Sequence, residues 1–249
     1  MYPQTHLYFA EKILGKISDE ITLGSIFPDF IISKTLDHQV AHQSGQKIYE
    51  ICRNNGKFLD LALAVITHGI NPQGLDYFGD EKYLDFERGY CFEKGRPFVE
   101  ETVKACNIPS RMGWWKSHNI IEMGIELRIS KINDFGPSVR HALNNVTLLK
   151  ELDNMLGSIT SGKSLSLVQK ASFFIKHIET GCITANSLAA KYNTQMITKH
   201  NISVNIPQVA LLIEKAAIAV DNDLEDFFQY AVSKVSETLL TVSTCEYFY

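Results

Sequence analysis

The sequence predicts an all-α fold, a multi-helix bundle, and two observations lead to this prediction. Alternation of apolar and polar residues, which marks a half-buried strand, persists for no more than a few residues anywhere in the chain. Apolar residues instead recur at spacings of three and four, most clearly over residues 114–133, where Ile121, Ile125, Ile129 and Ile132 share one stripe of a helix. The chain has 249 residues, 45% of them hydrophobic, which is enough for a substantial core.

Caps and breakers predict the helices of the first 110 residues. Helices are expected at residues 5–14, 37–52, 58–70 and 98–106. Thr5 and Asp37 are candidate N-caps. Between the first two helices, a glycine and a proline four residues apart predict an irregular loop over residues 23–29, which ends on Asp29. Residues 74–110 are rich in aromatic and charged side chains and, apart from the helix at residues 98–106, are also expected to be irregular.

A second group of helices is predicted after a Phe-Gly-Pro break at residues 135–137. Helices are expected at residues 138–157, 164–179, 184–199, 207–220 and 223–242. Residues 158–164 lack the strand and the glycine spacing of a phosphate-binding loop, so they are interpreted as a loop between helices. We therefore divide the chain into a core at residues 1–135 and a helical extension packed on it at residues 136–249, with one continuous domain as the alternative.

Composition excludes several classes of protein. The net charge of −4 and the pI near 6.1 give no electrostatic argument for a nucleic-acid partner. Five cysteines without a C-x-x-C spacing are interpreted as reduced, mostly buried thiols; they are Cys52, Cys91, Cys106, Cys182 and Cys245. The N-terminal residues do not resemble a signal peptide, and no apolar run reaches the ~18 residues of a membrane span. A cytoplasmic protein without a membrane span is expected.

Four histidines before residue 120 lie on, or at the end of, apolar faces of separate predicted helices. They are His6, His42, His68 and His118. Any one of them alone is best interpreted as a hydrogen-bonded core histidine. Together with Asp29 and Glu122, which follows His118 by one turn, they suggest a shared metal ion, because a core tolerates few such groups without a common purpose. Imidazole and carboxylate ligands suit Zn²⁺, with Fe²⁺ or Mn²⁺ as alternatives.

Other polar residues are assigned to the surface or to packing. The remaining histidines are His38, His141, His177 and His200, of which His38 forms a His-x-x-x-His pair with His42. On the helix at residues 114–133, Asn119, Glu126 and Lys131 are expected to face solvent.

With these residues in hand, the first half of the chain resembles the zinc-dependent phospholipase C family, whose all-α fold is shared by the secreted single-strand nucleases. The matching pieces, over about residues 3–133, are Thr5-His6-Leu-Tyr-Phe-Ala-Glu11-Lys-Ile-Leu14, Leu23-Gly-Ser-Ile-Phe-Pro-Asp29, Ala41-His42, Thr67-His68 and His118-Asn-Ile-Ile-Glu122. The resemblance implies a bundle of this type with a helical C-terminal extension. It also implies that the metal ligands are His6, Asp29, His42, His68, His118 and Glu122.

By the same resemblance the protein is a metal-dependent hydrolase of a small phosphoester. Metal ions of this family bind phosphate oxygens and lower the pKa of a water molecule at a mono- or dinuclear centre. Asp29 is then the catalytic residue that orients or deprotonates the attacking water.

The sequence departs from the family where an aspartate is expected one turn after His68, because Pro72 stands there. Asp76 is the preferred substitute and Asp80 the other candidate. No histidine lies between His68 and His118, although the family has one. These departures favour one or two ions. They also leave an alternative function open, a non-catalytic scaffold with a degenerate metal site that binds a protein partner through residues 138–249. A metallophosphohydrolase of the His-Asp type is a weaker alternative, because Asp37 and His38 stand in the reverse order.

Overall fold

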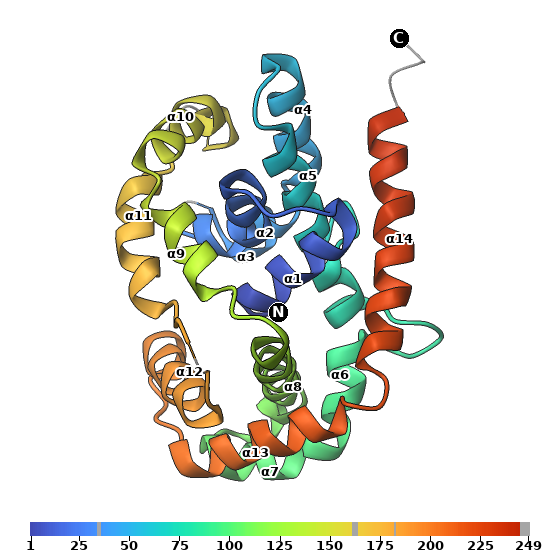
Figure 1. Ribbon diagram of the computed structural model, residues 1–249. Coiled ribbons are helices and arrows are strands. Elements are labelled where there is room, and N and C mark those ends of the chain that lie inside the picture. Colours follow the sequence, from blue (N-terminus) through green and yellow to red (C-terminus); the bar gives the residue numbers. More distant parts are fainter. Residues whose placement is uncertain (34–35, 161–163, 182, 245–249) are drawn as a thin grey trace. The chain divides into compact units, whose positions relative to one another are not determined.

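The computed structural model describes residues 1–33, 36–160, 164–181 and 183–244 (Figure 1). Over these residues the chain forms fourteen α-helices and no strand, which confirms the predicted all-α fold. Among the described helices, none combines the length and the apolar character that crossing a bilayer requires.

The helices form two compact units, each built from three segments of the chain. Unit 1 comprises Met1–Thr5, Phe78–Asp134 and Thr180–Phe228, and unit 2 comprises His6–Tyr77, Phe135–Glu179 and Gln229–Tyr249. The division at residues 1–135 and 136–249 follows chain order, whereas each unit combines segments from both parts. One boundary between units falls at Phe135, next to the predicted break.

Unit 2 holds most of the N-terminal helices. Its helices are α1 (Pro3–Leu14, from His6 onwards), α2 (Asp19–Ile31), α3 (His38–His42), α4 (Gly45–Asn55), α5 (Leu59–His68), α9 (Gly136–Asn144), α10 (Val146–Leu156), α11 (Leu167–Phe174) and α14 (Leu224–Thr244, from Gln229 onwards), with 3₁₀ turns at Gly157–Thr160 and Ile175–His177. Helix α2 packs closely on α5. A Cβ added at Gly24 of α2 would lie 2.3 Å from the carbonyl oxygen of Leu61 and 2.7 Å from Cβ of Ala64, so only glycine permits this approach.

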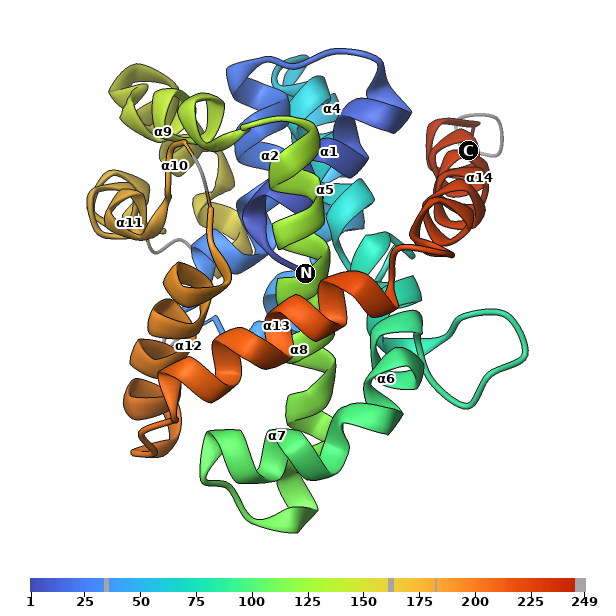
Figure 2. The ribbon, with the colours of Figure 1, turned by 60° about the horizontal axis from the view of Figure 1, so that its bottom comes forward.

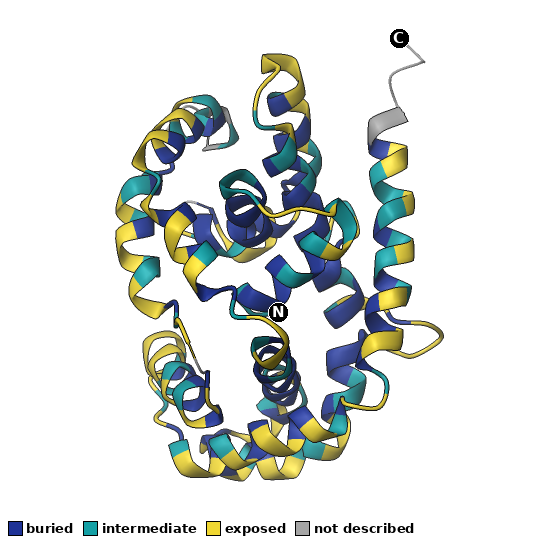
Figure 3. Cartoon of the chain, in the orientation of Figure 1, coloured by how far each residue is buried: buried dark blue, intermediate teal, exposed yellow. Residues whose placement is uncertain are grey.

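The prediction of an irregular loop over residues 23–29 is wrong, because α2 continues through them. The Ser18 side chain accepts a hydrogen bond from the backbone N–H of Ile21 and caps the helix. Pro28 lies inside the last turns of α2. Ten of the thirteen residues of α2 are buried, as its dark blue colour in Figure 3 shows. Burial on this scale outweighs the ~3 kcal/mol that an internal proline costs.

Unit 1 is organised around one long helix. Its helices are α6 (Tyr90–Gly95), α7 (Val99–Cys106), α8 (Gly113–Ile132), α12 (Ala185–His200) and α13 (Ile206–Ala219), with a π turn at Tyr77–Glu81 and 3₁₀ turns at Arg96–Phe98 and Ser110–Met112. Helices α6, α7 and α13 all pack on α8, and Figure 2 shows α13 crossing it. A Cβ at Gly124 of α8 would lie 2.7 Å from the backbone nitrogen of Ala217, so this crossing also depends on glycine.

Helix boundaries differ from the prediction at polar residues. The helix expected at residues 37–52 is split into α3 and α4 after His42, and the helix expected at residues 138–157 is split at Asn145. The Asn145 side chain accepts from the backbone N–H of Leu148, so a new N-cap forms where the periodicity alone indicated continuity. Helix α6 lies in a segment expected to be irregular. Asp37 caps α3 as predicted.

Cys52, Cys91 and Cys106 are buried and carry free thiols, as predicted. Cys182, Cys245 and residues 161–163 of the predicted loop lie outside the described residues.

We expect Gly24→Ala and Gly124→Ala each to lower the free energy of unfolding by about 1–3 kcal/mol, because the added methyl group meets backbone atoms of the partner helix. In an open helix the same change would stabilise by up to about 1 kcal/mol. Urea unfolding followed by circular dichroism measures the difference. Asn154→Ala, at an exposed position of α10, is the control and should change stability by less than about 0.5 kcal/mol. Unchanged or increased stability in both glycine variants would show that the helices can separate at no cost.

Candidate metal centre

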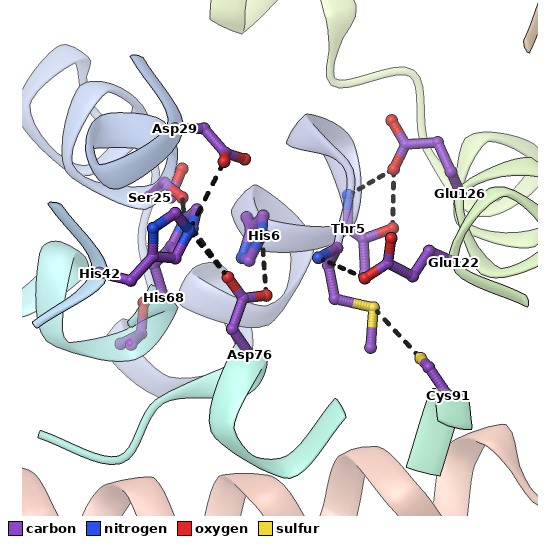
Figure 4. A network of polar contacts seen from close by, with 12 residues as sticks. Thr5, His6, Ser25, Asp29, His42, His68, Asp76, Cys91, Glu122 and Glu126 are labelled. Atoms are coloured by element: carbon purple, nitrogen blue, oxygen red, sulfur yellow. Dashed lines mark hydrogen bonds and ion pairs between the residues drawn. The ribbon is translucent and has the colours of Figure 1, made fainter. Parts of the chain in front are cut away.

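Five of the seven predicted ligands come together in unit 2 (Figure 4). This histidine–aspartate cluster consists of His6, Asp29, His42, His68 and Asp76. Each residue arrives on a separate element: His6 on α1, Asp29 in the last turn of α2, His42 and His68 as the final residues of α3 and α5, and Asp76 just before the π turn. All except Asp29 are buried.

Asp76 is the centre of the cluster. Its Oδ1 lies 3.4 Å from Nε2 of His6, and its Oδ2 lies 3.2 Å from Nε2 of His42 and 3.1 Å from Nε2 of His68. Figure 4 shows the carboxylate directed at the three imidazoles. Asp76 was the preferred substitute for the aspartate that Pro72 replaces, and the structure places it beside three of the predicted ligands.

Two of the imidazoles have a defined tautomer. Nδ1 of His68 lies 2.6 Å from the carbonyl oxygen of Ser25, and Nδ1 of His42 lies 2.9 Å from that of His38. A carbonyl only accepts, so each Nδ1 carries the proton and donates it. Each Nε2 of a neutral ring then points a lone pair inward. The two Nε2 atoms are 3.2 Å apart and both face Asp76. A positive charge, either a proton or a metal cation, is needed where these acceptors meet.

His6 supplies a third inward nitrogen. Its ring is stacked on that of His68, with ring centres 3.5 Å apart and planes 7° from parallel. Neither ring nitrogen of His6 has a hydrogen-bond partner among the described residues. The two rings face different oxygens of Asp76. One ligand atom each of His6, His68 and Asp76 lies within 4.8 Å of the others, so these three residues form a group that could hold a metal ion.

The charges of the cluster are strongly coupled. Burial lowers the pKa of His42, but Asp29 and Asp76 outweigh it and raise the pKa to about 10. Burial opposes ionisation of Asp76, yet the positive charge of the N-terminal amino group and the histidines hold its pKa well below the usual range. Burial and His68 lower the pKa of His6. Without a metal ion the cluster is therefore held together by a protonated His42 between carboxylates, which is the charge that a cation would replace.

Asp29 lies at the accessible side of the cluster. Its side chain is 31% exposed, and its Oδ1 lies 3.5 Å from Nε2 of His42. Burial opposes ionisation, but the contact with His42 keeps the Asp29 pKa well below its usual range, so the group is a carboxylate at neutral pH. His38, which was assigned to the surface, is exposed and stacks on His42 at 3.9 Å. One ligand atom each of Asp29, His38 and His42 lies within 4.8 Å of the others, so His38 could also contact an ion held by Asp29 and His42.

The other two predicted ligands belong to unit 1, where they meet Asp80. In this Glu122 cluster, one ligand atom each of Asp80, His118 and Glu122 lies within 4.8 Å of the others. Burial lowers the pKa of His118 to about 4, although Glu122 opposes the shift. The His118 ring is therefore neutral, and because the Asn119 amide donates to its Nε2, its proton is on Nδ1. Such a ring is a suitable metal ligand.

Two side chains orient the Glu122 cluster. Asn119 lies 2.9 Å from Nε2 of His118 and 3.2 Å from Oε2 of Glu122, and the ring of Phe92 stacks on His118 at 4.2 Å. The amino group of Met1 lies 3.0 Å from Oε1 of Glu122. Asp80, the second candidate for the missing aspartate, therefore lies beside predicted ligands in unit 1, as Asp76 does in unit 2.

Glu126 is the buried acid that the sequence analysis missed. It was expected to face solvent, but it is 2% exposed and accepts hydrogen bonds from the backbone N–H groups of Gln4 and Thr5 and from the Thr5 hydroxyl. It thereby satisfies free N–H groups at the start of α1. Its spacing of four from Glu122 placed it on the buried face of α8. Ile132, by contrast, was expected on the inner stripe and is 65% exposed.

Comparisons with known proteins do not assign the chain to a family. No family model, curated protein or solved structure matches the chain. The resemblance to the phospholipase C family and the metal-ligand roles of the predicted residues therefore stay predictions.

The pKa of His42 predicts how the stability of the metal-free protein depends on pH. Because the folded pKa is about 10 and the ordinary value is 6.5, the stabilisation from protonated His42 is complete below about pH 6.5 and is lost as the pH rises through 10. We expect this loss to reach up to about 1.4 kcal/mol per pH unit. Urea unfolding in the presence of a chelator, at a series of pH values, measures it.

The matched variants are His42→Gln, which should lack this dependence, and His141→Ala, which removes an exposed histidine of unit 2 and should retain it. An identical pH dependence in wild type and His42→Gln would show that His42 is not the titrating group.

Proposed function

We propose that this chain is a metal-dependent phosphoester hydrolase of the zinc-dependent phospholipase C type. The observation that carries the proposal is the convergence of three imidazole Nε2 atoms on the two oxygens of one buried carboxylate. Two of these imidazoles donate their other N–H to backbone carbonyls, which is the arrangement that orients metal-ligating histidines.

The donor set fits zinc. Neutral imidazoles and carboxylates are the ligands that Zn²⁺ takes in catalytic sites, and Fe²⁺ or Mn²⁺ accepts the same set. His6, His68 and Asp76 would hold one ion, and Asp29 and His42, with His38 beside them, would hold another. When bound, such ions polarise a phosphoryl oxygen and lower the pKa of a water molecule.

Asp29 is the residue of the cluster best placed to act on water. It is partly exposed, whereas the other members are buried. Its low pKa makes it a weak base, so it is better suited to orient an attacking water through a hydrogen bond than to hold the proton of that water. Of the two roles considered for Asp29, the electrostatics of the cluster favour orientation.

The Glu122 cluster supports the proposal independently. It repeats in unit 1 the combination of a buried neutral histidine with two carboxylates. Two of its members, His118 and Glu122, form the His-x-x-x-Glu pair that the resemblance implies as metal ligands. The substrate class that we propose is a small phosphoester, since the chain carries a net charge of −4 and has no general attraction for a nucleic-acid backbone.

We expect the protein purified without added metal to contain one or two zinc ions per chain, measured by inductively coupled plasma mass spectrometry. Chelation should lower the melting temperature, because an ion bound only by the folded state stabilises it. His68→Ala should lower the metal content, whereas His141→Ala, at an exposed position of α9, should not. Zero metal in the wild type, together with melting that is unchanged by chelation, would favour the non-catalytic scaffold.

Hydrolysis of a nitrophenyl phosphodiester in the presence of Zn²⁺ or Mn²⁺ tests catalysis. Asp29→Asn should lower kcat by about 100-fold or more, because an amide orients water less well than a carboxylate. His118→Ala and Glu122→Ala should each abolish the metal-dependent rate while the helix content stays unchanged. Glu100→Ala, an exposed acid of unit 1, should leave the rate within about twofold. Full activity in all three site variants would rule out both clusters as the catalytic residues.

A further inference from the structure

A basic group lies in unit 1 apart from the residues used so far. Lys116, in the first turn of α8, places its Nζ 3.0 Å from Nε2 of His200, the last residue of α12. The two residues are 84 positions apart, so only tertiary packing brings them together. Lys116 is 5% exposed.

Lys116 forms no ion pair among the described residues, although the charge of Glu122 acts on it from a greater distance. No carboxylate oxygen of the described residues lies within 4.0 Å of its Nζ, and its contacts are His200 and the ring of Trp115, whose centre is 3.9 Å away. A buried ammonium group without a counter-charge is costly. The contact with the indole ring offsets only part of this cost, since such contacts contribute about 0.5–2 kcal/mol.

One further positive charge, that of Lys199, acts on both Lys116 and His200. Lys199 precedes His200 in the last turn of α12. Partial burial, Lys116 and Lys199 together lower the pKa of His200. A helix C-terminus favours basic residues, which accounts for Lys199 and His200 at this position. It does not account for Lys116, which comes from the opposite end of another helix.

The group retains several unused donors. Nε2 of His200 accepts from Lys116, so the neutral ring carries its proton on Nδ1, for which the described residues provide no partner. The Lys116 ammonium keeps two further N–H bonds, and Lys199 is exposed. Trp115 is 50% exposed and His200 is partly exposed, so solvent reaches the group at these two side chains.

We propose that Lys116, Lys199 and His200 bind a phosphate-type oxyanion. A phosphate group carries the charge that the buried lysine lacks and enough acceptor oxygens to engage donors on three side chains. The site uses residues that belong to neither the histidine–aspartate cluster nor the Glu122 cluster, so it does not depend on the proposed hydrolase activity.

Isothermal titration calorimetry with inorganic phosphate, at constant ionic strength set with sodium chloride, tests this site. Lys116→Met should weaken phosphate binding at least tenfold. Lys131→Met makes the same change in charge at an exposed position of the same helix and should change the affinity by no more than twofold. His200→Gln, which removes the ionisable ring, should also weaken binding. Thermal melting verifies that each variant is folded.

A chelator separates this site from the metal ligands. Phosphate binding that persists after chelation and disappears in Lys116→Met supports the proposal. Binding that is lost on chelation but retained in Lys116→Met would overturn it, because the phosphate would then be held by metal ions. No detectable binding to folded wild type at millimolar phosphate would overturn it as well.

Discussion

Much of the chemistry proposed for this chain depends on the contacts of one buried carboxylate, that of Asp76. Three imidazoles approach its two oxygens, and none of these groups can be moved into the interior of unit 2 at a low cost unless their charges balance. In the metal-free protein the proton on His42 provides that balance. A metal ion bound as proposed would displace this proton, so the same contacts that stabilise the metal-free cluster would make ion binding dependent on pH.

Three residues near the Asp76 carboxylate lie at the C-terminal ends of helices. His42 and His68 are the last residues of their helices, and Asp29 lies in the last turn of α2, so the negative ends of three helices are directed toward the cluster. That geometry favours positive charge. Helices α2 and α5 are held close by the absence of a side chain at Gly24, which in turn brings the Ser25 carbonyl within reach of His68. Two neighbouring residues of α2 therefore have linked roles: Gly24 allows the close packing on α5, and the Ser25 carbonyl orients the His68 ring.

Helix α8 illustrates how much could be predicted for the candidate site. Its extent and the burial of His118 and Glu122 followed from periodicity, because a 3.6-residue repeat assigns each position to a face. Glu126 lies four residues after Glu122 and so shares its face, but it was expected in solvent because the sequence does not show the groups that pair with a buried acid. These are the N–H groups at the start of α1, which come from more than 120 residues away. Residues 23–29 show the same effect, since packing on α5 makes them helical despite a glycine and a proline.

The sequence by itself determined the all-α class, most of the helices and the four buried histidines, because periodicity and capping are local properties of the chain. It indicated Asp76 as a ligand candidate only through the resemblance, as a substitute for the aspartate that Pro72 replaces. The tertiary structure decided which polar groups meet: Asp76 with three histidines in unit 2, Asp80 with His118 and Glu122 in unit 1, and Lys116 with His200. Such meetings depend on contacts between helices that are distant in sequence, and no local pattern encodes the distance between two side chains that lie on different helices.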